Sequence, residues 1–224
     1  MRIQEHIYQG FFGLKKKKDA KQYYNERVDK LKGLDSDLDE IIDCFQSIMN
    51  NHNAKLKAYN DFLRKPTASG FAQVRSEIEK LEGMFDPDEL ANNKGQKYVL
   101  KNIDKLKDLT DNEESAEMQQ LEQESLSDLN ELLRLLKSIE PVWQEQIDFV
   151  KRYNDSQIVT QPDNLRKLSN IFIEESKILN MEESLLRRID LKTGTILRKT
   201  TLKQRDIQKT DDMDMRYREV KYVR

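Results

Sequence analysis

The chain has 224 residues, of which 36% are charged and 37% belong to the hydrophobic set, and its formal net charge is -2. An average globular domain has about 25% charged and about 45–50% apolar residues, so this composition excludes a compact domain with a large core and leaves disorder or long helices with a narrow buried stripe. Only seven glycines and four prolines occur, and strand-forming runs are almost absent. This favours long helices over an all-β or doubly wound fold.

An amphipathic and polybasic segment opens the chain over residues 1–18. Apolar residues recur on one helical face, and four lysines follow them directly. A helix is predicted next, over residues 19–32, and it should stop at Gly33 because glycine is common just past a helix C-terminus. The apolar residues of the opening face are Ile3, Ile7, Phe11 and Leu14.

The clearest pattern lies between Ser36, a candidate N-cap, and Pro66, which should end the helix. Residues in this segment recur with alternating steps of four and three, the spacing of a left-handed coiled-coil seam. The polar member, His52, could fix the register of helix packing or sense pH, or it could be an ordinary hydrogen-bonded neutral histidine. The predicted helix–helix seam consists of Leu38, Ile42, Phe45, Met49, His52, Leu56, Tyr59 and Leu63.

Two shorter helical segments follow. Thr67 or Ser69 should cap a helix that ends at Gly83. A loop is predicted over residues 92–95, and a helical stripe over residues 99–106. This loop lies at a possible boundary between two parts of the helical bundle, near residues 86–95.

The second half of the sequence predicts two more long helices and a tail. No glycine occurs over residues 112–153, and a wide apolar face there favours a central helix, kinked or broken at Pro141. Pro162 opens a last helix that should end near Gly194. Residues 195–224 are predicted to be a basic C-terminal tail, helical in part or ordered only on a partner.

These elements predict an all-α fold: an elongated helical bundle with long antiparallel coiled-coil-like helices. The bundle should occupy residues 19–194, between the N-terminal segment and the basic tail. Narrow apolar stripes on exposed helices predict that a second copy completes some of them, so we expect a homo-oligomer.

The sequence predicts no catalytic, cofactor or metal site. Its single cysteine, Cys44, excludes an intramolecular disulfide, and the two histidines, His6 and His52, form no metal-ligand pair with it. Phosphate-binding glycine loops, H-E-x-x-H, nucleophile elbows and EF-hand loops are absent. We therefore expect a protein that is not an enzyme and needs no cofactor.

The N-terminal segment carries a membrane-surface hypothesis. Aromatic side chains beside a polybasic run are the two ingredients of peripheral membrane binding, because the rings enter the interface while the lysines meet anionic lipid. The alternative is that the apolar side chains pack on the bundle and the lysines are solvated. The residues concerned are Phe11, Phe12, Leu14, Lys15, Lys16, Lys17 and Lys18.

Charge is distributed unevenly. Residues 1–32 carry nine Lys/Arg against four Asp/Glu, residues 108–149 carry two against twelve, and residues 192–224 carry ten against five. Tyr217 and Tyr222 in the tail would allow base stacking. We nevertheless expect no nucleic-acid partner, because a cluster of aspartates interrupts the tail and the sequence pI is near 5.9.

The expected function is that of a structural, scaffolding or adaptor protein, which acts through helical protein–protein interaction and self-assembly. The alternatives are a peripheral membrane-binding or membrane-remodelling protein and a secretion chaperone or phage or virion component. A single cysteine fits a reducing compartment, and no stretch approaches the roughly 20 apolar residues of a membrane span. We expect a cytoplasmic protein, with membrane association as the alternative.

Overall fold

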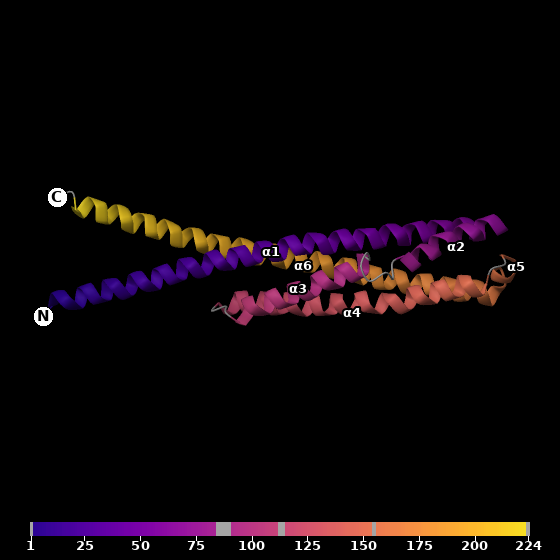
Figure 1. Cartoon of the computed structure of the whole chain (residues 1–224), viewed down its shortest axis with the longest axis horizontal. Coiled ribbons are helices and arrows are strands. Elements are labelled where there is room, and N and C mark those ends of the chain that lie inside the picture. The colour runs from indigo at the N-terminus through magenta and orange to yellow at the C-terminus, as the bar shows by residue number, and fades with distance from the viewer. Residues whose placement is uncertain (1, 84–90, 112–114, 154–155, 223–224) are drawn as a thin grey trace.

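The protein is a bundle of α-helices, shown by a computed structural model that describes residues 2–83, 91–111, 115–153 and 156–222 (Figure 1). Side chains are described over residues 20–82, 92–111, 115–153 and 157–210. The predicted all-α bundle is therefore confirmed, whereas its coiled-coil character stays a prediction. The helices of the described residues are α1 (Arg2–Arg64), α2 (Ala68–Gly83), α3 (Ala91–Asp111), α4 (Ala116–Arg152), α5 (Ser156–Val159) and α6 (Pro162–Tyr222).

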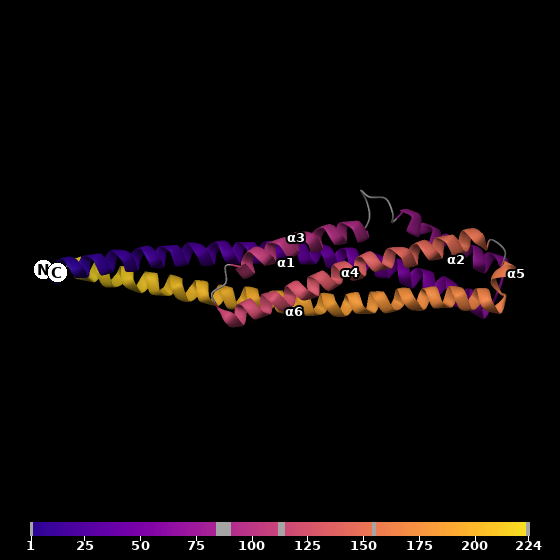
Figure 2. The ribbon, with the colours of Figure 1, turned by 90° about the horizontal axis from the view of Figure 1, so that it is seen from below.

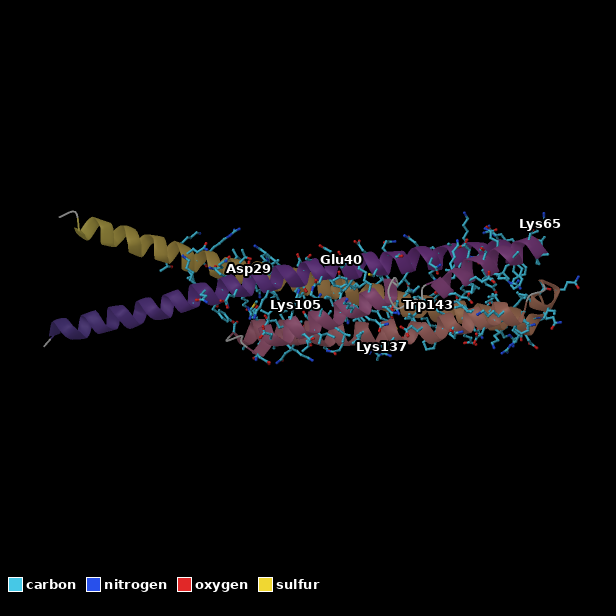
Figure 3. All side chains as sticks on the ribbon, in the orientation of Figure 1. Asp29, Glu40, Lys65, Lys105, Lys137 and Trp143 are labelled. Atoms are coloured by element: carbon cyan, nitrogen blue, oxygen red, sulfur yellow. The ribbon has the colours of Figure 1, made fainter. Side chains whose placement is uncertain are left out.

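The long helices α1 and α6 run side by side in opposite directions. Hydrogen bonds join Tyr59 Oη to Ser169 Oγ at 2.6 Å and Asn25 Oδ1 to Gln204 Nε2 at 2.8 Å. The later residue of α1 therefore contacts the earlier residue of α6, as in an antiparallel pair. Helix α4 packs against α6, α3 lies between α1 and α4, and α2 covers the far part of α1. Figures 1 and 2 show the helices lying roughly along one axis, and Lys65 marks the end at which α1 stops (Figure 3).

Helix α1 runs through Gly33, so the predicted helix end there is wrong. Leu31 and Leu34, on either side of the glycine, are both buried in the core. The carbonyl of Gly33 accepts a hydrogen bond of 2.8 Å from Lys105 Nζ of α3. Packing on both sides of the glycine thus outweighs its weak helix propensity, which is a cost of only about 1 kcal/mol.

The members of the predicted seam of α1 differ in burial, and the seam itself stays a prediction. Its members Leu38, His52 and Tyr59 are buried, but Ile42 and Leu63 are exposed. The remaining members are partly buried at the edge of the core. The second column of buried residues lies one residue earlier than predicted, and it consists of Ile41, Ile48, Lys55 and Phe62.

The segment between α1 and α4 differs from the prediction at one point. Thr67 caps α2, because the Gly70 backbone N–H donates to Thr67 Oγ1 at 3.1 Å, and α2 ends at Gly83 as predicted. The predicted loop over residues 92–95 is wrong, since these residues lie in α3. Asn92 is buried there and donates to the Leu136 carbonyl at 3.0 Å, so tertiary contact holds this polar stretch in the helix.

Two predicted interruptions of the later helices are also absent. Helix α4 continues through Pro141, which is exposed, while Ile139 and Trp143 on either side are buried. The break predicted there is wrong, and a kink stays a prediction. Helix α6 continues through Gly194 and carries the predicted tail as helix to Tyr222, because Thr193 and Ile196 flank that glycine with buried side chains.

Gly194→Ala is expected to raise the free energy of unfolding by about 0.5–1 kcal/mol. No atom outside the local helix lies within 4 Å of the position that a Cβ would take, so the methyl group meets no obstacle. Gly70→Ala is the control, because its Cβ would lie 3.1 Å from Thr67 Oγ1 and the gain should disappear. Urea denaturation of the full chain measures both variants, and equal effects would contradict the argument.

The chain ends form a two-helix extension, which we call the arm: residues 2–26 of α1 and 200–222 of α6. Figures 1 and 2 show both helices continuing past the ends of α3 and α4, with the two termini at the same end of the molecule. At the base of the arm, Arg27 donates to the Leu109 carbonyl at 2.9 Å, and Lys199 pairs with Glu117 of α4.

Candidate functional site: a buried polar cluster

A cluster of polar side chains lies in the middle of the bundle, where α1, α4 and α6 meet. On α1 and α4 its members are spaced three residues apart, which places each pair on one helix face. On α6 the two members are adjacent. Trp143, labelled in Figure 3, lies among the packed helices. We call this the central cluster, and its members are His52, Lys55, Trp143, Gln146, Glu175 and Ser176.

Glu175 is the hub of the central cluster. Its Oε1 accepts from Lys55 Nζ at 2.5 Å and from Trp143 Nε1 at 2.8 Å. Its Oε2 accepts from Gln146 Nε2 at 2.8 Å and lies 2.9 Å from His52 Nδ1. Lys55 also donates to Gln146 Oε1 at 3.0 Å. The carboxylate is therefore fully hydrogen-bonded, as a buried charge requires.

His52 connects the cluster to the backbone of α6. Its Nδ1 lies 2.9 Å from Glu175 Oε2. The other ring nitrogen lies 3.1 Å from Ser176 Oγ, whose hydroxyl donates to the Phe172 carbonyl at 2.8 Å. The histidine predicted to lie in a seam therefore fixes α1 against α6 at one register.

Burial and neighbouring charges have opposite effects on the pKa values of Glu175 and Lys55. Burial raises the pKa of Glu175, but the hydrogen bond from His52 and the charge of Lys55 outweigh it and hold the pKa at about 2. Burial lowers the pKa of Lys55, and the adjacent Glu175 carboxylate opposes that effect. The Glu175 carboxylate lies 2.5 Å from Lys55 Nζ, a distance typical of a charge-assisted hydrogen bond, so we assign a charged pair at neutral pH.

A second carboxyl group lies two helical turns further along α6. Glu182 is 0% exposed, and neither of its side-chain oxygens has a hydrogen-bond partner. Burial first, and then the Glu175 carboxylate, raise the pKa of Glu182 to about 8. The Glu182 carboxyl is therefore mostly protonated at neutral pH, which avoids a second unpaired buried charge.

Other ion pairs join the helices along their length. Arg27 of α1 pairs with Glu122 of α4, and both side chains are buried. Asp37 of α1 accepts from Lys101 and Lys105 of α3; burial raises the pKa of Asp37, but these two bonds outweigh it and lower the pKa. These pairs fix α1 against two different helices.

The acidic middle and the basic end of the sequence meet as α4 and α6. Asp128 accepts from Arg188 at 2.7 Å and from Lys192 at 3.0 Å. Lys192 also lies 3.3 Å from Glu124 of α4. Much of the charge asymmetry seen in the sequence is therefore neutralised within the bundle, on the face of α6 that packs against α4.

The central cluster is closed to substrates. Lys55 is 0% exposed and Glu175 1% exposed, so no solute reaches the pair without separation of the helices. A surface hollow of about 450 Å³ lies between α4 and α6, but Glu145, Lys167 and Glu174 line it and no cluster member does. Within the described residues, no group of three His, Cys, Asp or Glu is placed to hold a metal ion.

The predicted membrane-surface residues lie on α1 within the arm. The side chains of Phe11, Phe12, Leu14 and Lys15–Lys18 lie outside the described residues, so their packing is not assigned. Over the part of the chain that the structure describes, no helix combines the length and the apolar character that a membrane span requires.

Sequence reasoning identified His52 as a seam position but missed the charged members Lys55 and Glu175. The sequence did contain a signal for buried polar residues, because some positions of an otherwise apolar heptad repeat are occupied by charged residues. On α6, Glu175 and Glu182 fill the two gaps in an otherwise apolar column with alternating steps of four and three: Leu168, Phe172, Leu179, Leu186 and Ile189. A polar residue in such a gap indicates a buried partner on a neighbouring helix.

Comparison of the chain with family models, with curated proteins and with solved structures found no match in any of the three. The central cluster and the arm are therefore interpreted from their own geometry.

Proposed function

We propose that the chain is a non-enzymatic structural or scaffolding protein, which acts through helical protein–protein contacts and self-assembly. The arm is the observation that carries this proposal. Within the bundle, α1 and α6 are covered by α3 and α4, but in the arm both helices extend past α3 and α4 and spread apart toward their ends (Figure 1). Two helices alone leave much of their surface open to a further helix.

The described part of the arm supports this proposal. Tyr23, Tyr24 and Ile207 continue the inner faces of α1 and α6, but they are only half-buried, whereas Leu31 and Ile196 in the bundle are almost fully buried. Tyrosine is enriched at protein interfaces, where its ring packs and its hydroxyl finds a partner. The buried ion pairs of the bundle give the arm a rigid base.

A chain that carries Gln22→Cys in the arm is expected to form inter-chain disulfides on mild oxidation, because self-assembly brings arms of two copies together. Gln22 is exposed. The native Cys44 is buried, and burial raises the pKa of its thiol, so it should react slowly. Non-reducing electrophoresis measures the product, and sedimentation equilibrium measures the oligomeric state in parallel.

The matched control is Lys137→Cys, an exposed position on α4 away from the arm (Figure 3). It should remain uncoupled under conditions in which the Gln22→Cys chain is cross-linked. Equal cross-linking at both positions would indicate non-specific collision. A chain that sediments as a monomer at every concentration would refute self-assembly.

A further inference from the structure

One face of α6 stays exposed along most of the helix, and we call it the α6 stripe. It carries three large apolar side chains, Ile173, Leu191 and Leu202, which are 51%, 71% and 53% exposed. Residues 18 and 11 positions apart lie about five and three turns apart, so the three share one line along the helix. The exposed basic residues of the same face are Lys177, Arg187, Arg198, Arg205 and Lys209.

Toward the arm, the α6 stripe is mainly basic, with the exposed Asp206 beside it. Lys177 and Arg187 have carboxylates within reach on α6 itself, Glu174 at 4.0 Å and Glu183 at 2.6 Å. Within the described residues, by contrast, the structure gives Arg198, Arg205 and Lys209 no ion pair. Since the inner face of α6 is neutralised by α4, the positive charge of this helix is concentrated on its outer face.

The fold places a second basic segment at the same end of the molecule. Residues 1–32 carry nine Lys/Arg against four Asp/Glu, and residues 192–224 carry ten against five. Figures 1 and 2 show the start of α1 and the end of α6 at the same end of the molecule, where the two helices spread apart in the view of Figure 1.

We propose that the α6 stripe and the arm bind an anionic membrane surface. Lipid headgroups would neutralise Arg198, Arg205 and Lys209, while Leu191 and Leu202 enter the interface between them. This inference goes beyond the scaffolding function, because it requires no self-association.

The residue pattern favours a lipid surface over the other polyanions. A partner helix needs an apolar residue about every 3.5 positions, and the large apolar residues of the stripe are too sparse for such a seam. A nucleic acid gains phosphate contacts from the basic residues but nothing from the exposed leucines, and the stripe has no aromatic ring for base stacking. A second stripe of the same sign would be repelled.

Co-sedimentation of the full chain with vesicles tests the proposal. The native chain should pellet with vesicles rich in phosphatidylserine, should do so less at high salt, and should not pellet with pure phosphatidylcholine. A stripe variant should lose about a hundredfold in its partition coefficient. Each of the three basic residues that it removes contributes about fivefold to binding at an anionic surface. This variant carries Leu191→Gln, Arg198→Gln, Leu202→Gln, Arg205→Gln and Lys209→Gln.

A matched control changes the same number of exposed apolar and basic side chains away from the stripe, and it should bind vesicles as the native chain does. Circular dichroism melts confirm that both variants are folded. The proposal is overturned if the native chain does not bind anionic vesicles, if stripe and control variants bind equally, or if duplex DNA competes the chain off vesicles at equal phosphate concentration. The control carries Lys57→Gln, Lys97→Gln, Leu100→Gln, Lys107→Gln and Ile158→Gln, all at exposed positions.

Discussion

Replacing Lys55 with methionine is expected to lower the free energy of unfolding by roughly 3–5 kcal/mol at neutral pH, the usual cost of removing one partner from a buried ion pair. Methionine fills a similar volume, so the loss reflects charge rather than a cavity. The Glu175 carboxylate would keep its bonds to Trp143 and Gln146 but would lose the ammonium group 2.5 Å away. Urea denaturation of the full chain measures the change.

The double variant Lys55→Met/Glu175→Gln should recover much of this loss. A neutral amide can still accept from Trp143, and no uncompensated charge then remains in the core. Lys57→Met, two residues along α1 and exposed, should change the stability by no more than about 0.5 kcal/mol. A double variant as unstable as the sum of its single variants would show that the two side chains act independently.

Replacing Glu182 with leucine is expected to stabilise the protein most at alkaline pH. The pKa of this carboxyl is about 8 in the folded chain against 4.5 for an ordinary glutamate. Below pH 4.5 the carboxyl is protonated in both states and has no effect on pH dependence. Between 4.5 and 8 the unfolded chain releases this proton and the folded chain retains it, so stability falls as pH rises and then levels off.

The full loss for Glu182 amounts to roughly 5 kcal/mol, since the pKa rises from 4.5 to about 8 and one pKa unit corresponds to about 1.4 kcal/mol. Glu175 acts in the opposite direction: its pKa of about 2 contributes stability above pH 4.5, which is lost as the pH falls toward 2. Urea midpoints at pH 5 and pH 9 should therefore differ more in the native chain than in Glu182→Leu.

Glu183→Gln is the matched control for Glu182. This neighbour is partly exposed on α6 and pairs with Arg187 at 2.6 Å, so its removal should leave the pH profile almost unchanged. If the native chain and Glu182→Leu show parallel profiles of stability between pH 5 and pH 9, the Glu182 carboxyl is not protonated in the folded chain, and its pKa is not raised.

The sequence predicted a seam on α1 but did not show which of two adjacent columns of residues faces the core. Two candidate columns run side by side there, with apolar residues at 41 and 42, at 48 and 49, and at 62 and 63. They differ at one point, where one has Lys55 and the other Leu56. Periodicity favours the column without the charge, but the structure buries the column with it. A lysine enters a core only when a carboxylate from another helix meets it, and a single helix holds no information about that partner.

Helix ends were misjudged for a related reason. Gly33 and Gly194 are good local stop signals, but each has a buried side chain on either side. The cost of a glycine inside a helix is about 1 kcal/mol, which is less than the stabilisation from burying one large apolar side chain, about 1.5–3 kcal/mol. At Thr67 and Gly83 the local signals predicted the helix boundaries correctly.

The sequence by itself determined the fold class, the long helices and the uneven charge, because hydrophobic period and composition are properties of one segment at a time. Only the tertiary structure decided which polar residues are buried, which charges are neutralised and which chain ends lie together. The central cluster requires three helices to meet, and the arm requires α1 and α6 to run in opposite directions, so that both chain ends lie at one end of the molecule. Both depend on contacts between residues more than a hundred positions apart, whose free energy appears only when the helices pack.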